Sequence, residues 1–133
     1  MRGIILILCA FALVAPSACG ERAHASTAWI ARMTVPTHTP KARERWPVKI
    51  VATTMSGRAL SGTVQYHFLI GGQVIATRSF HNTGSVPCHF TGGIYRDVIR
   101  WPARSIGVRL TFQATVKTRL GKKNLNYWVR VRR

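Results

Sequence analysis

The sequence predicts an all-β protein, an antiparallel sandwich of about seven strands. Three observations lead to this fold class. Apolar and polar residues alternate with a period of two through most of the chain after residue 25, and no stretch there has the periodicity of an amphipathic helix. Gly, Pro, Ser and Asn interrupt the alternation at short intervals. Strands of this kind bury every second side chain, so two layers that face each other would shield the apolar residues.

The stretches with this alternation follow one another along the chain, and each has a length typical of a strand. The predicted strands are Trp29–Val35, Trp46–Thr54, Gly62–Ile70, Gln73–Phe80, Ile94–Trp101, residues 108–117 and residues 125–132.

Residues typical of turns lie between these strands. Gly71-Gly72 is a two-residue hairpin signal, because both glycines accept a positive φ. Other turns are expected at Met55–Ser61, Pro102–Gly107 and Leu120–Asn124. Two stretches lack alternation and are expected to be irregular, the first as a basic linker or an edge crossing: Pro36–Arg45 and His81–Gly93.

The first 25 residues have the features of a secretory signal peptide. Arg2 gives a positive start, an unbroken apolar stretch of 11 residues follows at 4–14, and Ala23-His24-Ala25 offers a small-x-small cleavage pattern. The apolar stretch is too short to span a bilayer, which needs about 20 apolar residues. We therefore expect cleavage after Ala25 and a secreted or extracytoplasmic protein.

Cys19 allows a second interpretation of the same region, as the lipidated cysteine of a lipoprotein box. Such boxes carry an apolar residue three positions before the cysteine, where this chain has Pro16. Soluble export is therefore favoured, and membrane attachment is expected only if Cys19 is lipidated. After cleavage at Ala25, Cys88 is the remaining cysteine, so the sequence predicts no internal disulfide.

The chain from about residue 46 onward resembles a known class of domain. The run WPARSIGVRLTFQATVKTRLGKKNLNYWVRVR is similar to the last two strands of bacterial immunoglobulin-like or fibronectin type III-like domains, and Gly57 and Gly62 flank a similar turn. The resemblance implies that the last two strands share a sheet with Gly62–Ile70. Trp46 and Trp101 are candidates for the core tryptophan. The expected organisation is a signal peptide at 1–25, an N-terminal strand and basic linker at 26–45, and an immunoglobulin-like sandwich at 46–133.

The most unusual feature of the composition is the excess of basic over acidic residues. The chain has 20 Lys and Arg against three Asp and Glu, for a formal net charge of +17. Internal ion pairs cannot neutralise such an excess, so the surface is expected to attract polyanions. Outside the cytoplasm these would be an anionic envelope polymer, acidic lipid headgroups or extracellular nucleic acid. An arginine-rich genome would produce the same composition without such a partner.

The sequence predicts no enzyme and no cofactor. Acid–base catalysis by a pair of carboxylates needs two acidic groups that converge on a substrate, whereas Glu44 lies in the predicted linker and Asp97 in a strand. Asp97 is expected to orient its neighbours Arg96 and Arg100 by ion pairing. There is no nucleophile motif and no phosphate-binding glycine loop. The metal-binding residue types His81, Cys88 and His89 share one stretch, but their spacing fits no common zinc pattern, so ordinary loop residues are the favoured interpretation.

The outer face of the sheet that contains the last two strands is the candidate site. If a cationic sheet with one exposed aromatic ring binds an anionic polymer, the tryptophan would stack on a ring of that polymer. Residues with this predicted role are Arg109, Lys117, Arg119, Lys122, Lys123, Trp128, Arg130 and Arg132. Three alternatives remain open: a solvated face whose charges discourage aggregation, an assembly module that binds another envelope protein, and a small metal-binding protein.

Overall fold

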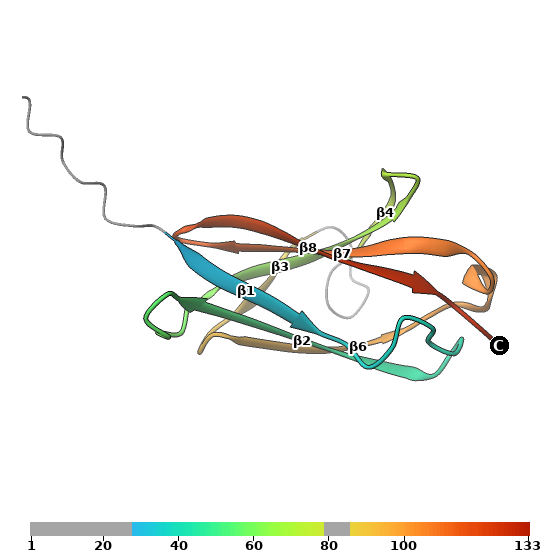
Figure 1. The fold of residues 1–133 in the computed structure, drawn as a ribbon, viewed down its shortest axis with the longest axis horizontal. Helices are drawn as coiled ribbons and strands as arrows, with labels where there is room; N and C mark the ends of the chain where they lie inside the picture. The colour runs from blue at the N-terminus through green and yellow to red at the C-terminus, as the bar shows by residue number, and fades with distance from the viewer. Residues whose placement is uncertain (1–27, 79–85) are drawn as a thin grey trace, which may run out of the picture.

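The computed structural model describes residues 28–78 and 86–133. These residues form two antiparallel sheets that pack face to face, which confirms the predicted all-β sandwich (Figure 1). The predicted signal peptide, Cys19 and His81 lie outside the described residues. The strands are β1 (Trp29–Thr34), β2 (Arg45–Thr54), β3 (Gly62–Ile70), β4 (Gln73–Arg78), β5 (Cys88–Phe90), β6 (Ile94–Arg100), β7 (Arg109–Thr118) and β8 (Gly121–Arg130).

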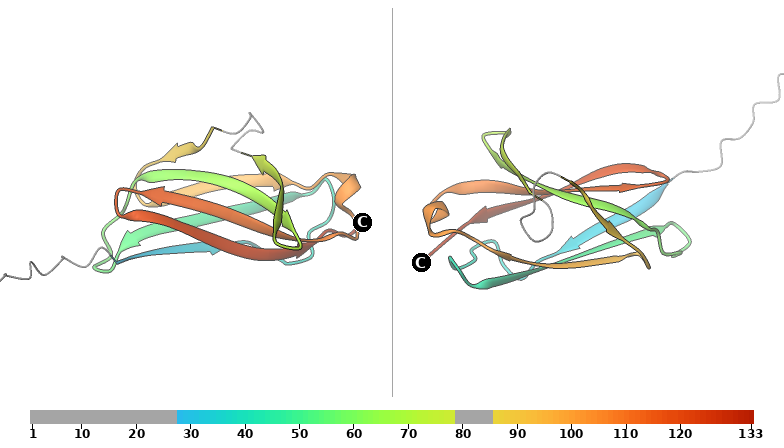
Figure 2. Two further views of the ribbon diagram at one scale, coloured as in Figure 1. Left: turned by 90° about the horizontal axis from the view of Figure 1, so that it is seen from above. Right: turned by 180° about the vertical axis from the view of Figure 1, so that it is seen from behind.

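One sheet has the strand order β1-β2-β6, and the other has the order β4-β3-β7-β8 with β5 paired to β3. The prediction that Gly62–Ile70 shares a sheet with the last two strands is confirmed, since Phe68 pairs with Phe112 and Phe112 with Tyr127. The C-terminus lies at the end of the sandwich opposite the start of β1 (Figure 2).

The core between the layers is built from the predicted apolar faces. Phe112, Ala114 and Val116 on β7 are fully buried. Trp46 and Trp101 are buried as well, and their rings meet edge to face with centroids 5.3 Å apart. Burial of one such side chain stabilises the fold by roughly 1.5–3 kcal/mol. Arg109 and Arg130 point to solvent, as the alternation predicts.

The turn between β7 and β8 differs from the prediction. It consists of Arg119 and Leu120, because Thr118 already pairs with Gly121. Gly121 has a φ of 133°, which a residue with a side chain rarely adopts. The predicted turn at Leu120–Asn124 is therefore wrong, since Asn124 pairs in register with Thr115. Polar residues that resemble a loop in the sequence here extend a strand whose outer face is solvated.

The stretch His81–Gly93 was expected to be irregular, and in part this is wrong. Its residues Cys88–Phe90 form β5, which pairs with the start of β3, and Phe90 is buried. Gly93 follows with a φ of 75°, and its carbonyl oxygen accepts the N–H of Ala52 at 2.8 Å. Three residues are too few to display a period, so alternation alone does not reveal such a strand.

The basic stretch between β1 and β2 lies along the free edge of β8. The bonds join backbone groups. The carbonyl of His38 accepts the N–H of Arg130 (2.9 Å), and the carbonyl of Pro40 accepts the N–H of Arg132 (2.9 Å). The N–H of Ala42 donates to the carbonyl of Arg132 (2.9 Å). These bonds cover the side of the sandwich where β1 and β8 are the outer strands. We call this the closed side.

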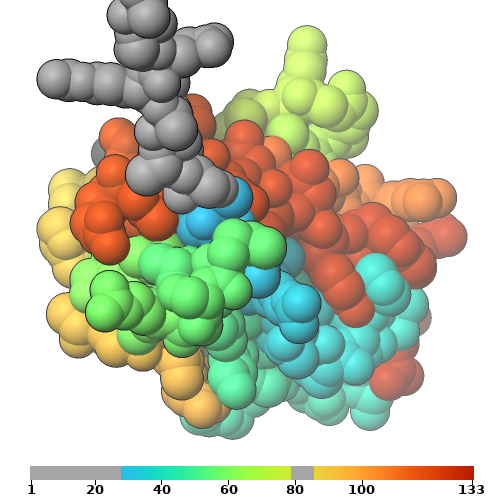
Figure 3. Space-filling model, turned by 60° about the vertical axis from the view of Figure 1, so that its left-hand side comes forward, coloured from blue at the N-terminus to red at the C-terminus, as the bar shows by residue number. Residues whose placement is uncertain are grey.

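On the opposite side, β4 and β6 are the outer strands of their sheets, and we call this the open side. The pairing of β3 with β4 shifts register between Phe68 and Leu69. From there the β3–β4 hairpin turns away from both layers and projects from the surface (Figures 1 and 3). The sandwich therefore has one covered edge and one uncovered edge. Within residues 28–78 and 86–133, no helix has the length and apolar character that crossing a membrane requires.

Candidate anion-binding surface

The outer face of β7 and β8 carries two pairs of like charges. Arg109 lies directly opposite Arg130, and Lys117 lies directly opposite Lys122. Eight residues of β7 separate the two pairs, a distance of about 26 Å at the usual rise of a strand. We call them the arginine end and the lysine end of this face.

Between these ends the face is polar and uncharged. The side-chain amide of Gln113 donates to Asn126 (2.8 Å), and the hydroxyl of Thr115 donates to Asn124 (2.9 Å). On β3, Nδ1 of His67 is 3.0 Å from the hydroxyl of Thr77. The predicted cationic sheet is therefore two separate positive regions joined by a ladder of hydrogen-bonded side chains.

Trp128 lies at the arginine end and is 43% exposed. The ring of His38 stacks on it with centroids 4.1 Å apart, and the guanidinium of Arg109 is 5.2 Å from the Trp128 centroid. His38 also stacks on Tyr127 at 3.8 Å, and its Nδ1–H donates to the carbonyl of Trp128 (2.7 Å). The tryptophan predicted to stack on a ligand already has protein partners that fix its orientation.

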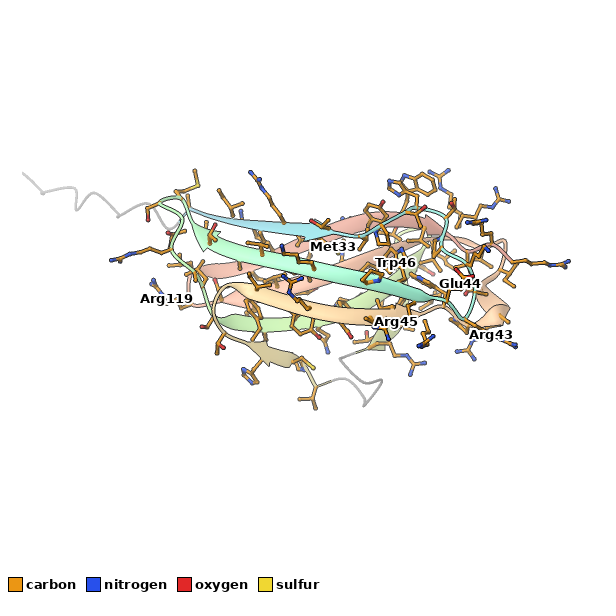
Figure 4. The ribbon with its side chains drawn as sticks, turned by 90° about the horizontal axis from the view of Figure 1, so that it is seen from below. Met33, Arg43, Glu44, Arg45, Trp46 and Arg119 are labelled. Atoms are coloured by element: carbon orange, nitrogen blue, oxygen red, sulfur yellow. The ribbon has the colours of Figure 1, made fainter. Side chains whose placement is uncertain are left out.

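The lysine end includes the β7–β8 turn, where Arg119 lies at the tip of the hairpin. Figure 4 places Arg119 at one end of the molecule and Arg43 and Arg45 at the other. Lys123, which was expected to add charge at the hairpin tip, is exposed and lies close to that tip. In the observed register it is opposite Val116, on the inner side of β8. Its Nζ donates to the carbonyl of Trp29 (2.6 Å) and lies 5.1 Å from the centroid of the Trp29 ring.

Arg132 follows β8 and belongs to the arginine end by its position. Its Nε donates to the carbonyl of Thr39 (3.0 Å), and its backbone pairs with Pro40 and Ala42. This side chain is therefore held against the segment that covers the closed side, and it extends the positive region around the edge of the sheet.

The other sheet carries like-charge pairs that the sequence reasoning missed. On its outer face Arg45 lies opposite Arg100, and Lys49 lies opposite Arg96. Alternation alone indicates that Lys49 points outward. Only the pairing register of β2 with β6 shows which cation faces it. Both broad faces of the sandwich are therefore basic.

The chain itself does not neutralise these cations. Residues 28–78 and 86–133 contain 18 of the 20 Lys and Arg, all except Arg2 and Arg22, and two carboxylates. Glu44 is 3.5 Å from the Nζ of Lys41. Like charges directly opposite each other on a sheet cost about 0.2–1 kcal/mol per pair. An anion bound between the members of a pair would remove this repulsion.

Asp97, which we expected to orient Arg96 and Arg100, faces the interior. It accepts the hydroxyl of Tyr66 (3.0 Å) and the N–H of Val98 (2.6 Å). Burial raises the pKa of Tyr66 far above its usual value, and the neighbouring Tyr95 and Asp97 raise it further. Burial likewise raises the pKa of Tyr95. Tyr66 thus remains a hydrogen-bond donor, and its bond to Asp97 connects β3 to β6 across the sandwich.

The residue types considered for metal binding do not converge in the part of the chain that the structure describes. Cys88 and His89 are neighbours on β5, so their side chains point to opposite sides of the strand. No group of three His, Cys, Asp or Glu side chains in residues 28–78 and 86–133 is placed to hold a metal ion. Cys88 is half-buried with a free thiol.

Comparison with known proteins supports the fold and does not identify a family. No protein-family model matches the chain, and no curated protein matches it either. The solved structure of Spo0M, a sporulation control protein from Bacillus subtilis, is similar over 80% of this chain and 50% of its own, with 10% identity and a TM-score of 0.52. An engineered protein is similar over 77% of this chain and 20% of its own, with 16% identity and a TM-score of 0.47. The chain spans half or less of each, and the likeness to Spo0M concerns the sandwich fold alone.

Proposed function

We propose that this protein is an exported, non-enzymatic binding module that captures an anionic polymer on its basic sheet faces. The observation that carries the proposal is the set of directly opposed like-charge pairs on both faces. Cations that lie directly opposite each other repel and lower the stability of the fold. A sulfate, phosphate or carboxylate group bound between them would replace this repulsion with attraction. Guanidinium pairs suit such groups because each presents a planar fork of donors.

The features of the first 25 residues support export. The proposed partner is therefore an anionic envelope polymer or another acidic extracellular surface, and membrane attachment would follow only from lipidation of Cys19. An immunoglobulin-like or fibronectin type III-like relationship remains part of this proposal, supported by the sequence of the last two strands and by the presence of two facing sheets.

The test is a titration of the protein with heparin, a sulfated polyanion, at increasing salt concentration. Affinity is expected to fall linearly on logarithmic axes as counterion release loses its advantage. The double variant Arg109→Gln/Arg130→Gln and the double variant Lys117→Gln/Lys122→Gln should each bind more weakly and with a smaller salt slope. An affinity that does not change with ionic strength would contradict the proposal.

A second candidate function is assembly with another envelope protein, and the β3–β4 hairpin favours it. Val74 and Ile75 on this hairpin are 55% and 57% exposed, and the hairpin projects from the body of the sandwich (Figure 3). Exposed apolar side chains on a projecting edge strand are typical of a protein contact. Light scattering and a pull-down from an envelope extract, compared for the native chain and Val74→Ser/Ile75→Ser, would distinguish this function by its weak dependence on salt.

A further inference from the structure

A groove of about 1170 Å³ follows β6 on the open side of the sandwich. One wall is β4, which contributes Ile75 and Ala76, and the other is β6. The volume is comparable to that of small-molecule sites, which usually measure about 300–1,000 Å³. The groove exists because the β3–β4 hairpin turns away from the layers, so the edges of the two sheets do not meet.

The floor of the groove is aromatic. It includes Tyr66, Phe68 and Trp101. All three rings contact Phe112 beneath them, with centroids 4.9, 5.7 and 6.2 Å away, and Phe68 meets Trp101 at 5.6 Å. The floor is thus one continuous apolar layer. This shape suits a hydrocarbon chain better than an extended peptide, whose alternate side chains need separate pockets.

Arginines line the rim of the groove, and they gather at one end of it. Arg45 and Arg100 are a directly opposed pair, and Arg104 follows Trp101 in the short 3₁₀ turn Ala103–Ser105. Nη1 of Arg100 donates to the carbonyl of Arg43 (3.1 Å), which holds this guanidinium near the groove. Arg78 and Arg96 also border the groove farther along. Asp97 is three residues from Arg100, about 10 Å along the strand, so its negative charge lies away from the arginine-rich end.

Trp101 at this end has an unsatisfied polar atom. The side chain is 2% exposed, and its indole N–H has no hydrogen-bond acceptor among the described residues. The neighbouring core tryptophan, Trp46, donates its indole N–H to the carbonyl of Thr37 (3.0 Å). An orphaned buried donor costs about 1–3 kcal/mol.

We infer that the groove binds a single-chain amphiphile with an anionic headgroup. The hydrocarbon chain lies against Phe68, Ile75 and Ala76, and the carboxylate, sulfate or phosphate lies between Arg45, Arg100 and Arg104. The groove shares Arg45 and Arg100 with one polymer-binding face, whereas its apolar lining lies between the sheets and is remote from the pairs on β7 and β8.

The experiment uses dodecyl phosphate below its micelle concentration, with calorimetry and tryptophan fluorescence as readouts. One equivalent is expected to bind, about ten-fold more tightly than the uncharged 1-dodecanol. Arg45→Gln should lower the affinity for dodecyl phosphate by about ten-fold. The control, Arg119→Gln, removes the same charge at the opposite end of the molecule (Figure 4) and should leave that affinity unchanged.

Several outcomes would overturn the inference. If many equivalents bind, or if Arg45→Gln and Arg119→Gln have equal effects, the amphiphile merely associates with a cationic surface. If an acidic extended peptide binds in the groove and dodecyl phosphate does not, the groove is a peptide site and the inference of an amphiphile is wrong. The double variant Arg109→Gln/Arg130→Gln keeps the groove intact, so it should lose heparin affinity and retain dodecyl phosphate. Failure of one proposal is thereby distinguished from failure of the other.

Discussion

The closed and open sides of the sandwich differ in how the outer strands of the two sheets are covered and connected. On the closed side, the segment that contains His38 bonds to the edge of β8, and Lys123 donates to the backbone of β1. On the open side no equivalent segment among the described residues covers β4 and β6, and the bond from Tyr66 to Asp97 connects the layers from below. Edges of sheets need protection, and in residues 28–78 and 86–133 it is the edge of β8 that receives it from backbone hydrogen bonds.

The two core tryptophans show what this difference means. Trp46 is satisfied by a carbonyl from the covering segment, whereas Trp101, in edge-to-face contact with it, has an indole N–H without an acceptor. The segment that covers the closed side therefore supplies the hydrogen bond that holds one core tryptophan, and the other lacks such a bond among the described residues.

The largest expected effect comes from a matched pair of substitutions in these tryptophans. Trp46→Phe should destabilise the protein by about 3 kcal/mol, because it removes a hydrogen bond, orphans the Thr37 carbonyl and leaves a small cavity. Trp101→Phe should cost only about 1 kcal/mol, since no hydrogen bond is lost. Urea unfolding of both variants measures the difference, and equal losses would show that the two sides are not distinct.

Alkaline pH should lower the stability of the fold, because Tyr66 ionises in the unfolded chain at a lower pH than in the folded protein. Because the pKa of Tyr66 is raised in the folded state, its stabilising contribution is complete below the unfolded pKa of about 10 and is lost as pH rises above it. The free energy of unfolding should fall by up to about 1.4 kcal/mol per pH unit for this group. Tyr66→Phe should have a flatter profile between pH 10 and pH 11 than the native chain. Profiles that coincide would exclude Tyr66 as the cause.

On the closed side, His38→Ala should have a moderate effect. The substitution removes the stacking of His38 on Tyr127 and Trp128 and the bond to the Trp128 carbonyl, and we expect a loss of about 1–2 kcal/mol. Hydrogen exchange should report faster exchange of the Arg130 and Arg132 amides, which bond to the covering segment. If the protection of these two amides is unchanged, the covering segment stays bonded to β8 without the side chain of His38.

The smallest effect concerns the opposed cations, and its sign is unusual. Lys122→Gln and Arg130→Gln should each stabilise the protein by about 0.2–1 kcal/mol at low salt, since each removes a like-charge pair. The gain should shrink as salt rises. Arg119→Gln, in the turn and outside these pairs, is the control. A loss of stability in both paired variants would show that the pairs are not repulsive.

Much of the fold could be predicted from alternation. The inward face of β7 and that of β8 from Leu125 onward follow directly from residue order, because apolar side chains alternate there, and the burial of Phe112 follows with them. The observed turn at Arg119-Leu120 did not follow, because Gly121 and two lysines resemble a polar loop. Strand pairing, which is a long-range property, decided between these possibilities.

The candidate site was predicted only in part for the same reason. Alternation placed Arg109, Lys117 and Arg130 outward, but it could not show that cations face each other across strands. The pair Arg45 and Arg100 was missed entirely, since 54 residues separate its members in the sequence. The contact of Lys123 with the carbonyl and ring of Trp29 could not be predicted from alternation either, because the two residues lie 94 positions apart.

The central claim is that opposed cations on the two faces hold the anionic partner. Amide and side-chain NMR signals recorded during titration with a sulfated oligosaccharide test it most directly. We predict that the largest shifts occur at Arg109 and Arg130, at Lys117 and Lys122, and at the corresponding pairs of β2 and β6. Shifts spread evenly over all basic residues, or confined to unpaired cations such as Arg58 and Arg119, would contradict it.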